Sequence, residues 1–427
     1  MATRAFGDVV RAAQTEGRLV VQPRMGFGDP RRMRQGLAAV KDASAATVGT
    51  ITVDSYTRLA QHPEARAALD AGRALNGYPI VAHGPQTTRR LLQGIAVDDF
   101  PVQVRHGSAH PQAIVRALGA AGLTATEGGP VSYCLPYGRT PVRTSVANWV
   151  EACALLAALR QPQHEPHLET FGGCLLGQLC PPSLLVATSV LEALFFQQQD
   201  IRSISLSYAQ QTNEQQDAEA VHALARLAAE LLGDTDWHVV IYAYMGRFPR
   251  TPPGASRLLA DAARLAVRTG AARLIVKTTV EAIRIPTVAE NVAALEHAAG
   301  AAAQAARQLF PISDSETYRE ARALVEGVLD LDDDVGRALV LALRRGRLDV
   351  PYCLHPDNAG RTESRLDADG WLRWSRTGAM PISATRPATR RIGSSDLLAA
   401  LSYVERRYDT GRLGPVPAPT TTIRRTS

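Results

Sequence analysis

The chain has 427 residues, of which 45% are hydrophobic and 21% are charged, and its formal net charge is +6. This composition is that of an ordinary globular protein, and the length allows one large domain with appendages or two to three smaller domains. The basic excess is spread along the chain, which argues against a nucleic-acid or membrane surface and is compatible with an anionic substrate.

Features that report on the cellular compartment indicate a cytoplasmic protein without a membrane span. The five cysteines are scattered and show no CxxC or Cys/His spacing, so we expect reduced thiols and neither a disulfide framework nor a metal site. The first 17 residues predict an amphipathic helix with charges throughout, unlike a signal peptide. The longest apolar run, LLVATSVLEALFF, is interrupted by Glu192 and is too short to span a bilayer.

From residue 18 onwards, short β-branched runs alternate with Ala/Leu/Arg-rich stretches of helical spacing. Such alternation predicts a mostly parallel sheet flanked by helices. The predicted strands are 18–24, 47–54, 78–83, 101–105, 123–127, 167–171, 202–208, 237–244 and 272–277. The predicted helices include 59–75, 86–93, 111–121, 145–160, 184–199, 214–232 and 256–269.

Two α/β architectures fit this alternation, a doubly wound sheet and a (β/α)8 TIM-type barrel. No GxGxxG follows the first strand and no P-loop occurs, so a nucleotide-binding doubly wound sheet has no support. Polar residues recur at the ends of many strands, and in a barrel those ends meet at one mouth. We therefore predict the barrel. One of the nine predicted strands must then be wrong or lie outside it, and 167–171 is the weakest.

The part of the chain that follows Ile285-Pro286 is mostly helical. Helices are predicted at 288–309, 315–329, 333–345 and 394–408, with irregular turns and a short hairpin before the last, and Gly370 in the hairpin turn. The Pro/Thr-rich tail predicts disorder. The predicted organisation is an N-terminal helical segment (1–17), the barrel (18–287), a mixed helical and irregular C-terminal extension (288–412) and a disordered tail (413–427).

Three arginines, Arg24, Arg58 and Arg105, each close a short apolar run. Arginine presents a planar fork of donors that binds a carboxylate bidentately, and it stays charged when partly buried. A cluster of arginines is costly without anions, which either a bound ligand or neighbouring acids such as Asp54 could provide. A dicarboxylate or phosphate site and a set of structural ion pairs are therefore equally compatible with the pattern.

Three further polar residues lie at or beyond the end of the fifth predicted strand. Glu127 precedes two glycines, where it could pair with an arginine or could hold or move the proton of a substrate ammonium. Tyr133 and Tyr137 lie beyond it, where their hydroxyls could bind a ligand without adding charge or could simply pack.

Lys277 closes the strongly apolar run LIVKT. It could form a Schiff base if its pKa is depressed, bind a hydroxyl, or pair with Glu281. His106 follows a predicted strand and could be an acid, a metal ligand or a hydrogen-bonded structural residue. His83 ends a predicted strand, and for both histidines the structural role is the commonest one.

Several motifs together resemble one family, the large (epsilon) subunit of adenosylcobalamin-dependent glutamate mutase, also called methylaspartate mutase. The resemblance is collinear from about residue 18 to about residue 400. The matching segments are QPRMG, TVDSYTR, LNGYP, QVRHG, TEGGPVSY with LPY, FGGCLLGQLCPPS, YMGRFP, LIVKTTVEAIRIPT, DVP and DNAG.

The resemblance implies a barrel whose mouth is capped by a separate, small cobalamin-binding subunit of the sigma type. It implies a radical carbon-skeleton rearrangement of L-glutamate to L-threo-3-methylaspartate. Adenosylcobalamin would supply a 5'-deoxyadenosyl radical, and the substrate radical would fragment to a glycyl radical and acrylate before recombining. The family also suggests two copies of each subunit, that is, a homodimer within a heterotetramer.

The resemblance also implies roles for individual residues. Arg24, Arg58 and Arg105 match an arginine claw for the two substrate carboxylates. Glu127 matches the carboxylate that contacts the substrate amino group, with Tyr133 and Tyr137 beside it. The expected catalytic residues are thus Glu127, Arg105, Tyr133 and Tyr137. The residues expected at the cofactor are Gly26, Asn76, Pro136, Phe171, Phe248, Lys277 and Glu281.

Three positions depart from the family pattern. Cys134 stands where Asn is usual, Pro130 stands where Gly is usual, and Arg247 adds a bulky side chain beside Phe248. The chain also lacks a DxHxxG signature, so we expect the cobalt ligand to come from the partner subunit. Two alternatives remain open, a Schiff-base lyase or aldolase that uses Lys277, and a non-catalytic paralogue that binds a dicarboxylate.

Overall fold

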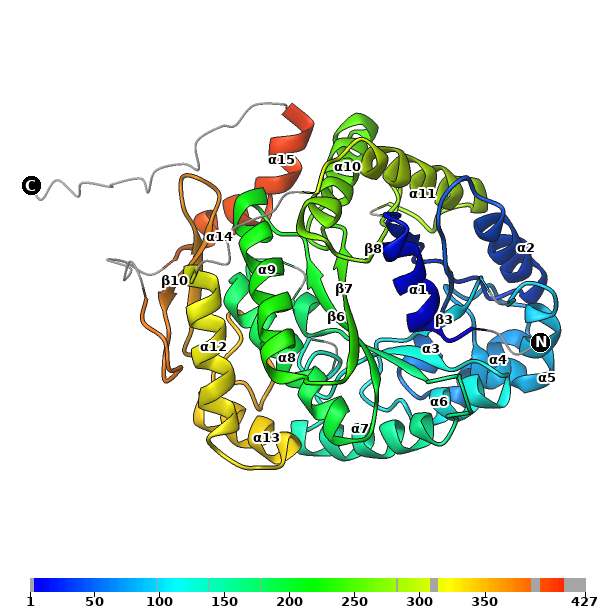
Figure 1. Ribbon diagram of the computed structural model, residues 1–427, viewed down its shortest axis with the longest axis horizontal. Coiled ribbons are helices and arrows are strands. Elements are labelled where there is room, and N and C mark those ends of the chain that lie inside the picture. Colours follow the sequence, from blue (N-terminus) through cyan, green and yellow to red (C-terminus); the bar gives the residue numbers. More distant parts are fainter. Residues whose placement is uncertain are drawn as a thin grey trace, which may run out of the picture.

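Eight parallel strands follow one another around a barrel (Figure 1) in the computed structural model, which describes residues 4–97, 99–136, 138–176, 178–281, 283–307, 314–384 and 392–410. Their hydrogen-bonded order is β1-β8-β7-β6-β5-β4-β3-β2. A parallel bridge between Val21 and Thr47 brings the two end strands together. The strands are β1 (Val20–Gln22), β2 (Gly49–Thr52), β3 (Val102–Arg105), β4 (Ala125–Gly128), β5 (His167–Thr170), β6 (Ser203–Ala209), β7 (Asp236–Tyr242) and β8 (Arg273–Ile275).

This arrangement confirms the predicted TIM-type α/β barrel and identifies the wrong strand. Residues 167–171, the weakest prediction, contain β5, whereas 78–83 form no strand and instead enter helix α5 (Ile80–Leu92). The run YPIVA is apolar because Tyr78, Ile80 and Ala82 are buried against the barrel. The backbone N–H of Tyr78 donates to the carbonyl of Thr52, 2.9 Å away, which ties this segment to the end of β2.

A ring of helices covers the outside of the strands (Figure 1). Besides α5, the ring contains α2 (Pro30–Lys41), α6 (Gln112–Ala120), α7 (Val142–Ala157), α8 (Pro182–Gln198), α9 (Glu214–Leu231), α10 (Pro252–Thr269) and α11 (Val288–Ala303). Helix α2 was not predicted, although its start carries two common helix signals. Asp29 caps it by accepting a hydrogen bond from the backbone N–H of Arg32, and Pro30 occupies its first position. Helix α11 packs between α10 and α2, although the predicted barrel segment stops at residue 287.

The N-terminal helix α1 (Phe6–Thr15) lies against the N-terminal ends of the strands. Phe6 is buried and stacks on His167 of β5, with their ring centroids 5.0 Å apart. Arg11 forms an ion pair with Asp236 at the start of β7. Helix α1 therefore covers the end of the barrel opposite the carboxyl ends of the strands, which are left accessible.

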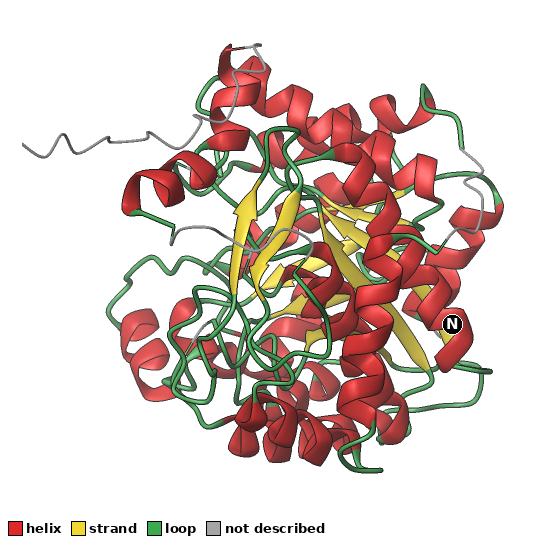
Figure 2. Cartoon of the chain, turned by 90° about the vertical axis from the view of Figure 1, so that its left-hand side faces the viewer, coloured by secondary structure: helices red, strands yellow, loops and turns green. Residues whose placement is uncertain are grey.

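The C-terminal extension packs along one side of the barrel (Figures 1 and 2). It contains α12 (Glu316–Leu329), α13 (Val335–Arg345), the hairpin β9 (Glu363–Leu366) and β10 (Leu372–Arg376), α14 (Ser394–Leu401) and α15 (Tyr403–Thr410). Gly370 lies in the hairpin turn with a φ of 81°, as predicted. Residues 411–427, which include the predicted disordered tail, lie outside the described residues.

Helix α8 carries the longest apolar run of the sequence, and its surroundings explain that run. The strands β5 and β6 contact one side of it, and α9, α12 and α13 contact the others. A helix that is covered all round is apolar all round, because no face of it meets water. Within the described residues, no helix combines the length and the apolar character that crossing a membrane requires.

Candidate active site

The carboxyl ends of the strands surround a cavity of about 290 Å³. In a TIM-type barrel this is the end at which active sites are built. The cavity brings together most of the residues singled out in the sequence. Those that line it are Arg24, Gly26, Arg58, Asn76, Arg105, His106, Glu127, Tyr133, Phe171 and Glu281.

Local structure places each of the three arginines at the cavity. Arg24 lies two residues beyond β1, and Arg105 is the last residue of β3. Arg58 ends the short helix α3 (Ser55–Arg58), which begins at Asp54. The Asp54 carboxylate accepts hydrogen bonds from the backbone N–H groups of Tyr56 and Thr57, at 2.9 and 3.2 Å. Asp54 therefore caps this helix, and Arg58 forms no ion pair with any residue that the structure describes.

Arg105, Glu127 and Tyr133 form one connected group. The Nε of Arg105 donates to Oε2 of Glu127 at 2.6 Å, and the hydroxyl of Tyr133 donates to Oε1 of the same carboxylate. All three side chains are buried, with exposed fractions of 5% or less. An ion pair buried this deeply loses its hydration, so the hydrogen bond from Tyr133 helps to satisfy the carboxylate. Pairing with an arginine was one of the two roles that the sequence left open for Glu127, the other being contact with a substrate ammonium.

Two residues that sequence reasoning missed, Tyr242 and Glu169, extend this group. The hydroxyl of Tyr242, at the end of β7, contacts Oε2 of Glu127 at 2.8 Å and also Oε1 of Glu169. Nη2 of Arg105 donates to the Tyr242 hydroxyl at 3.2 Å. Glu127 and Glu169 are partners in the register of β4 and β5, so their side chains leave the sheet side by side.

Beneath the cavity, the barrel interior is filled by a polar layer rather than by the branched aliphatic side chains usual in such barrels. Its centre is the ion pair between Arg273 of β8 and Glu169. Ser205 contacts both partners, at 2.9 Å from Arg273 and 3.2 Å from Glu169. The layer consists of Gln22, Thr50, Gln103, Glu169, Ser205 and Arg273, all fully buried. The signal in the sequence was a charged or amide residue inside a β-branched run, as in VVQP, HLET and ARLIV.

On the side of the cavity formed by β1 and β8, Nη1 of Arg24 lies 3.0 Å from Oε1 of Glu281. Lys277 is buried nearby, and its Nζ lies 4.4 Å from the centroid of the Phe248 ring. Burial and, after it, the charge of Arg24 lower the pKa of Lys277 to about 8, against the opposing effect of Glu281. The ion pair considered for Glu281 from the sequence is thus formed with Arg24.

The loop after β4 is held in place by Glu192 of α8. Its carboxylate accepts hydrogen bonds from the backbone N–H groups of Val131 at 3.2 Å, Ser132 at 2.9 Å and Phe171 at 3.3 Å. Burial raises the pKa of Glu192 to about 7, although these hydrogen bonds oppose the shift. A Cβ atom at Gly129 would lie 2.0 Å from this carboxylate, so the position requires glycine.

Two further predicted residues belong to that loop. Pro136 is half-buried and is not among the residues that line the cavity. Tyr137, predicted as a catalytic and substrate-binding residue, lies outside the described residues.

His106 and His83 both have hydrogen-bonded structural surroundings. His106 accepts a hydrogen bond from the backbone N–H of Ser108 at 3.0 Å and stacks on Trp149. Burial, followed by the charge of Arg105, lowers the pKa of His106 to about 3, so the ring is neutral. His83 contacts the carbonyl of Gly28 at 2.8 Å. Among the described residues, no group of three or more His, Cys, Asp or Glu side chains is placed to hold a metal ion.

The three departures from the family pattern point away from the cavity. The thiol of Cys134 donates to the carbonyl of Thr140 at 3.0 Å, and burial raises the pKa of this thiol to about 12. The carbonyl of Pro130 accepts from the Ser145 hydroxyl at 2.7 Å. Arg247 turns towards α15, where it pairs with Glu405. None of the three lines the cavity.

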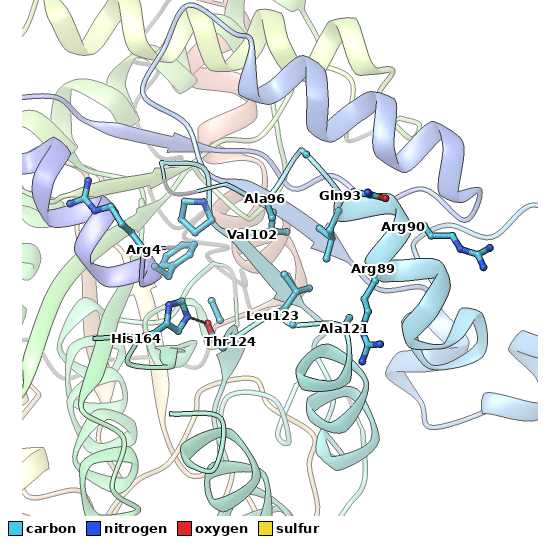
Figure 3. A pocket seen from close by; sticks show the side chains of 16 residues that line it. Arg4, Arg89, Arg90, Gln93, Ala96, Val102, Ala121, Leu123, Thr124 and His164 are labelled. Atoms are coloured by element: carbon cyan, nitrogen blue, oxygen red, sulfur yellow. Dashed lines mark hydrogen bonds between the residues drawn. The ribbon is translucent and has the colours of Figure 1, made fainter. Parts of the chain in front are cut away.

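A larger cavity, of about 450 Å³, lies at the opposite end of the barrel (Figure 3). Its wall contains Arg4 and Phe6 at the N-terminus, the end of α5, and the start of β4. His164 contacts the Thr124 hydroxyl there, and Arg89 donates to the carbonyl of Ala120. No residue singled out in the sequence lines it, so its size does not make it the functional site.

Comparison with known proteins gives one consistent result. The chain matches the family described as Methylaspartate mutase E chain (MutE) over residues 2–394. A glutamate mutase epsilon subunit from Escherichia coli O157:H7 is 30% identical over 397 residues, which cover 89% of this chain and 81% of that protein. The subunits from Desulfitobacterium hafniense (strain Y51) and Halobacterium salinarum are each 31% identical, over 399 and 420 residues. They cover 89% and 95% of this chain, and 82% and 85% of those proteins.

Among solved structures, a putative phosphonomutase from Burkholderia cenocepacia J2315 aligns with 63% of this chain and 91% of its own. The TM-score is 0.35 and the sequence identity is 12%. This likeness is too weak to carry an argument, and the barrel is assigned from its own strand pairing.

Proposed function

The chain belongs to the family of the methylaspartate mutase E chain, and on this basis we propose that it is the catalytic subunit of a coenzyme B12-dependent glutamate mutase. The reaction is the rearrangement of L-glutamate to L-threo-3-methylaspartate. The observation that carries the proposal is the convergence of Arg24, Arg58 and Arg105 with Glu127 on one cavity. Two carboxylates and an ammonium on a short carbon chain are complementary to this set of charges.

The arginines hold the substrate carboxylates and keep the two fragments apart from solvent while the carbon skeleton is open. The Nε of Arg105 donates to Glu127, and its Nη2 donates to the Tyr242 hydroxyl. The Nη1 group is left to bind a substrate carboxylate. Arg58 is free of carboxylate partners among the described residues and binds the second one. Positioning of this kind accounts for much of catalysis when reactive fragments must neither diffuse nor turn.

Glu127 receives the substrate ammonium. Its carboxylate is held on one side by Arg105 and on the other by Tyr133, so its orientation is fixed before substrate arrives. Tyr133 in turn is held by the loop that Glu192 anchors. A pre-oriented acceptor binds ammonium without the cost of ordering a mobile side chain.

The residues on the β1 and β8 side fit the ribose of an adenosyl group. The Glu281 carboxylate offers acceptors at the cavity wall, and the Lys277 ammonium offers donors close to Phe248. When bound, adenosylcobalamin supplies the radical that takes a hydrogen atom from the substrate. The further residues proposed at the cofactor are Gly26, Asn76, Pro136 and Phe171.

Two of these positions also have structural reasons for their identity. A Cβ atom at Gly26 would lie 2.2 Å from the carbonyl oxygen of Thr52, so glycine is required by packing alone. Asn76 accepts a hydrogen bond from the backbone N–H of Ser55 at 3.0 Å and thereby fixes the start of α3. Both line the cavity, and Asn76 supports the helix that ends in Arg58.

A small cobalamin-binding subunit of the sigma type covers the cavity and supplies the cobalt ligand, in a cytoplasmic heterotetramer built around a homodimer. Exposed apolar side chains at the mouth support a covering partner. Leu59 directly follows α3 and Arg58 and is 53% exposed, while Ile283 and Ile285 lie in the segment between β8 and α11 and are 76% and 50% exposed. Apolar groups gathered beside a cavity in this way mark interaction surfaces.

The test is to mix the chain with a cognate small subunit, adenosylcobalamin and L-glutamate, and to assay for 3-methylaspartate. Product that forms with the small subunit and not without it supports the proposal. Product from this chain and cobalamin alone would exclude the role of the partner. A mixture that yields no product with any cognate small subunit would exclude the mutase.

The depressed pKa of Lys277 favours a second candidate, a Schiff-base lyase or aldolase. An amine with a pKa of about 8 is partly uncharged near neutral pH, as a nucleophile must be. Borohydride trapping of a substrate adduct on Lys277 would establish this activity. A non-catalytic dicarboxylate-binding paralogue is distinguished by electron paramagnetic resonance, because it would give no substrate radical with glutamate.

A further inference from the structure

Tyr242 occupies an unusual position at the floor of the cavity, between two buried carboxylates. Its hydroxyl contacts Oε2 of Glu127 at 2.8 Å and Oε1 of Glu169, and it accepts a hydrogen bond from Arg105 at 3.2 Å. The Arg105 guanidinium also lies 5.1 Å from the centroid of the Tyr242 ring. Tyr242 and Glu169 are fully buried, and neither matches a site residue implied by the sequence.

The hydroxyl has one proton and two carboxylate acceptors. Burial raises the pKa of Tyr242, and both glutamates act in the same direction against the opposing effect of Arg105, so the phenol stays protonated. It can therefore donate to only one of Glu127 and Glu169 at a time. The number of acceptor positions that remain on Glu127 therefore depends on which carboxylate accepts the hydrogen bond of the Tyr242 hydroxyl.

A carboxylate offers about four acceptor positions. On Glu127, Arg105 fills one and Tyr133 fills another. If Tyr242 also donates to Glu127, one position is left for a ligand, and if it donates to Glu169, two are left.

We propose that Tyr242 and Glu169 set the affinity of the cavity for an amino group. In this arrangement the Tyr242 hydroxyl donates its hydrogen bond to Glu169 while Glu127 holds a ligand ammonium. The inference rests on the proposed function, in which Glu127 receives the ammonium of an amino dicarboxylate. Tyr242 and Glu169 are positioning residues in this account, because they act through Glu127.

The anchoring of Glu169 makes this arrangement directional. Oε2 of Glu169 accepts from Arg273 and lies 3.3 Å from Nε2 of Gln103, so its other oxygen is the one presented to Tyr242. In Glu169→Gln, Arg273 still requires an oxygen, which turns the amide nitrogen towards the Tyr242 hydroxyl. The amide then donates to the Tyr242 oxygen, so the Tyr242 hydroxyl can donate its own hydrogen bond only to Glu127.

The test compares the binding of L-glutamate and of glutarate, which has the same two carboxylates and no amino group, to the full chain by calorimetry. Glu169→Gln is expected to weaken glutamate binding about tenfold, the effect of about one hydrogen bond to a charged group, and to leave glutarate binding within about twofold. Unchanged glutarate binding also shows that the variant is folded. The double variant Glu169→Gln with Tyr242→Phe is expected to restore glutamate binding, because the competing donor is gone.

A second variant keeps the test decisive if Glu169→Gln does not fold. Tyr242→Phe alone is expected to bind glutamate as tightly as the wild type or more tightly, with glutarate unchanged. Tyr244→Phe is the matched control, because Tyr244 is equally buried two residues further on and packs in a separate cluster with Leu179 and Phe248. It is expected to change neither affinity.

Several outcomes would overturn the inference while leaving the proposed function standing. These are equal weakening of both ligands by Glu169→Gln, wild-type glutamate affinity in that variant, no restoration in the double variant, or a selective loss of glutamate binding in Tyr242→Phe. Wild-type chain that binds glutarate but not glutamate would instead overturn the proposed function, and the inference with it.

Discussion

The guanidinium of Arg24 is already occupied by a carboxylate of the same chain, since Glu281 lies 3.0 Å from it across the cavity wall. Arg24 is proposed to bind a substrate carboxylate and Glu281 to bind the ribose of the cofactor. A substrate carboxylate would then compete with Glu281 for Nη1 of Arg24. Where the substrate takes Nη1, Glu281 is released to the cofactor side.

The first prediction concerns this internal competition. Glu281→Gln removes the competing charge while keeping the shape of the side chain, so the full chain is expected to bind glutarate about fivefold more tightly. The pair is partly exposed, and about 1 kcal/mol is the upper range for such pairs. Isothermal calorimetry at low ionic strength measures the change.

A surface arginine–glutamate pair far from the cavity provides the control. Glu326 pairs with Arg322 on α12 at 2.7 Å, and neither residue lines the cavity. Glu326→Gln is expected to leave glutarate affinity unchanged. Equal affinities for the wild type and Glu281→Gln would show that Glu281 does not compete for the Arg24 site.

The second prediction is that Arg105→Lys loses most turnover while keeping the fold. Arg105 reaches Glu127 through Nε and Tyr242 through Nη2, and a lysine ammonium cannot reproduce both directions together with a bond to substrate. Loss of one charge-assisted hydrogen bond costs about 3 kcal/mol, so kcat/KM is expected to fall about 100-fold.

Steady-state kinetics with the reconstituted enzyme, alongside circular dichroism, check this prediction. Arg116→Lys is the control, because Arg116 pairs with Glu151 on the exposed surface of the ring and is expected to keep wild-type turnover. Turnover of Arg105→Lys close to wild type would make Arg105 peripheral to the reaction.

The third prediction concerns the support that α15 gives to the loop after β7. Glu405 is nearly buried, pairs with Arg247 and lies 2.7 Å from Arg250. The same loop carries Met245, which lines the cavity, and Phe248, which packs on Lys277. Glu405→Gln is expected to lower kcat/KM about three- to tenfold, because the loop that bears both residues loses its charged anchor.

This effect is measured by kinetics at constant salt and by the rate of proteolysis in the loop. Arg406→Ala on the same helix is the control, since its contacts are with Ser402 and Ala399 of the preceding turn and helix. If Glu405→Gln matched Arg406→Ala in both measurements, the extension would not contribute to the site.

The sequence predicted those cavity residues that lie at the ends of apolar runs, because such runs form the strands of the barrel. The three arginines and Glu127 were found because each closes an apolar run, and strand ends meet in a barrel. The run YPIVA was misread as a strand because burial against the barrel makes a helix start as apolar as a strand does. Local pattern alone does not separate these cases, and the structure resolves them through the hydrogen bond from Tyr78 to Thr52.

The polar floor of the cavity was beyond this reasoning for a different reason. Glu169, Tyr242 and Arg273 lie on three different strands, β5, β7 and β8, and each run alone indicates at most a polar side chain within a strand, without its partners. Their significance is that they share a buried hydrogen-bond network, which depends on the register of β5, β7 and β8. Strand register across a barrel is a long-range property, and no pattern within a single run encodes it.

The last prediction uses Glu192, whose carboxylate holds the loop of Tyr133 from inside the protein. Burial raises the pKa of Glu192 to about 7 in the folded state, above the ordinary value of 4.5. A carboxyl with a raised folded pKa contributes stability at low pH that is lost as the pH rises towards that pKa. Between pH 5 and pH 8 the wild type is therefore expected to lose about 2 to 3 kcal/mol of unfolding free energy from this group.

Glu192→Gln removes this titration, so it is expected to be more destabilising at pH 5 than at pH 8, by a similar 2 to 3 kcal/mol. Urea unfolding at the two pH values measures the difference. Leu191→Ala, at the neighbouring fully buried position of α8, is the control, because it removes packing and is expected to destabilise equally at both pH values. A Glu192→Gln variant with the same destabilisation at pH 5 and pH 8 would mean that the Glu192 carboxylate keeps its charge in the folded protein across this range.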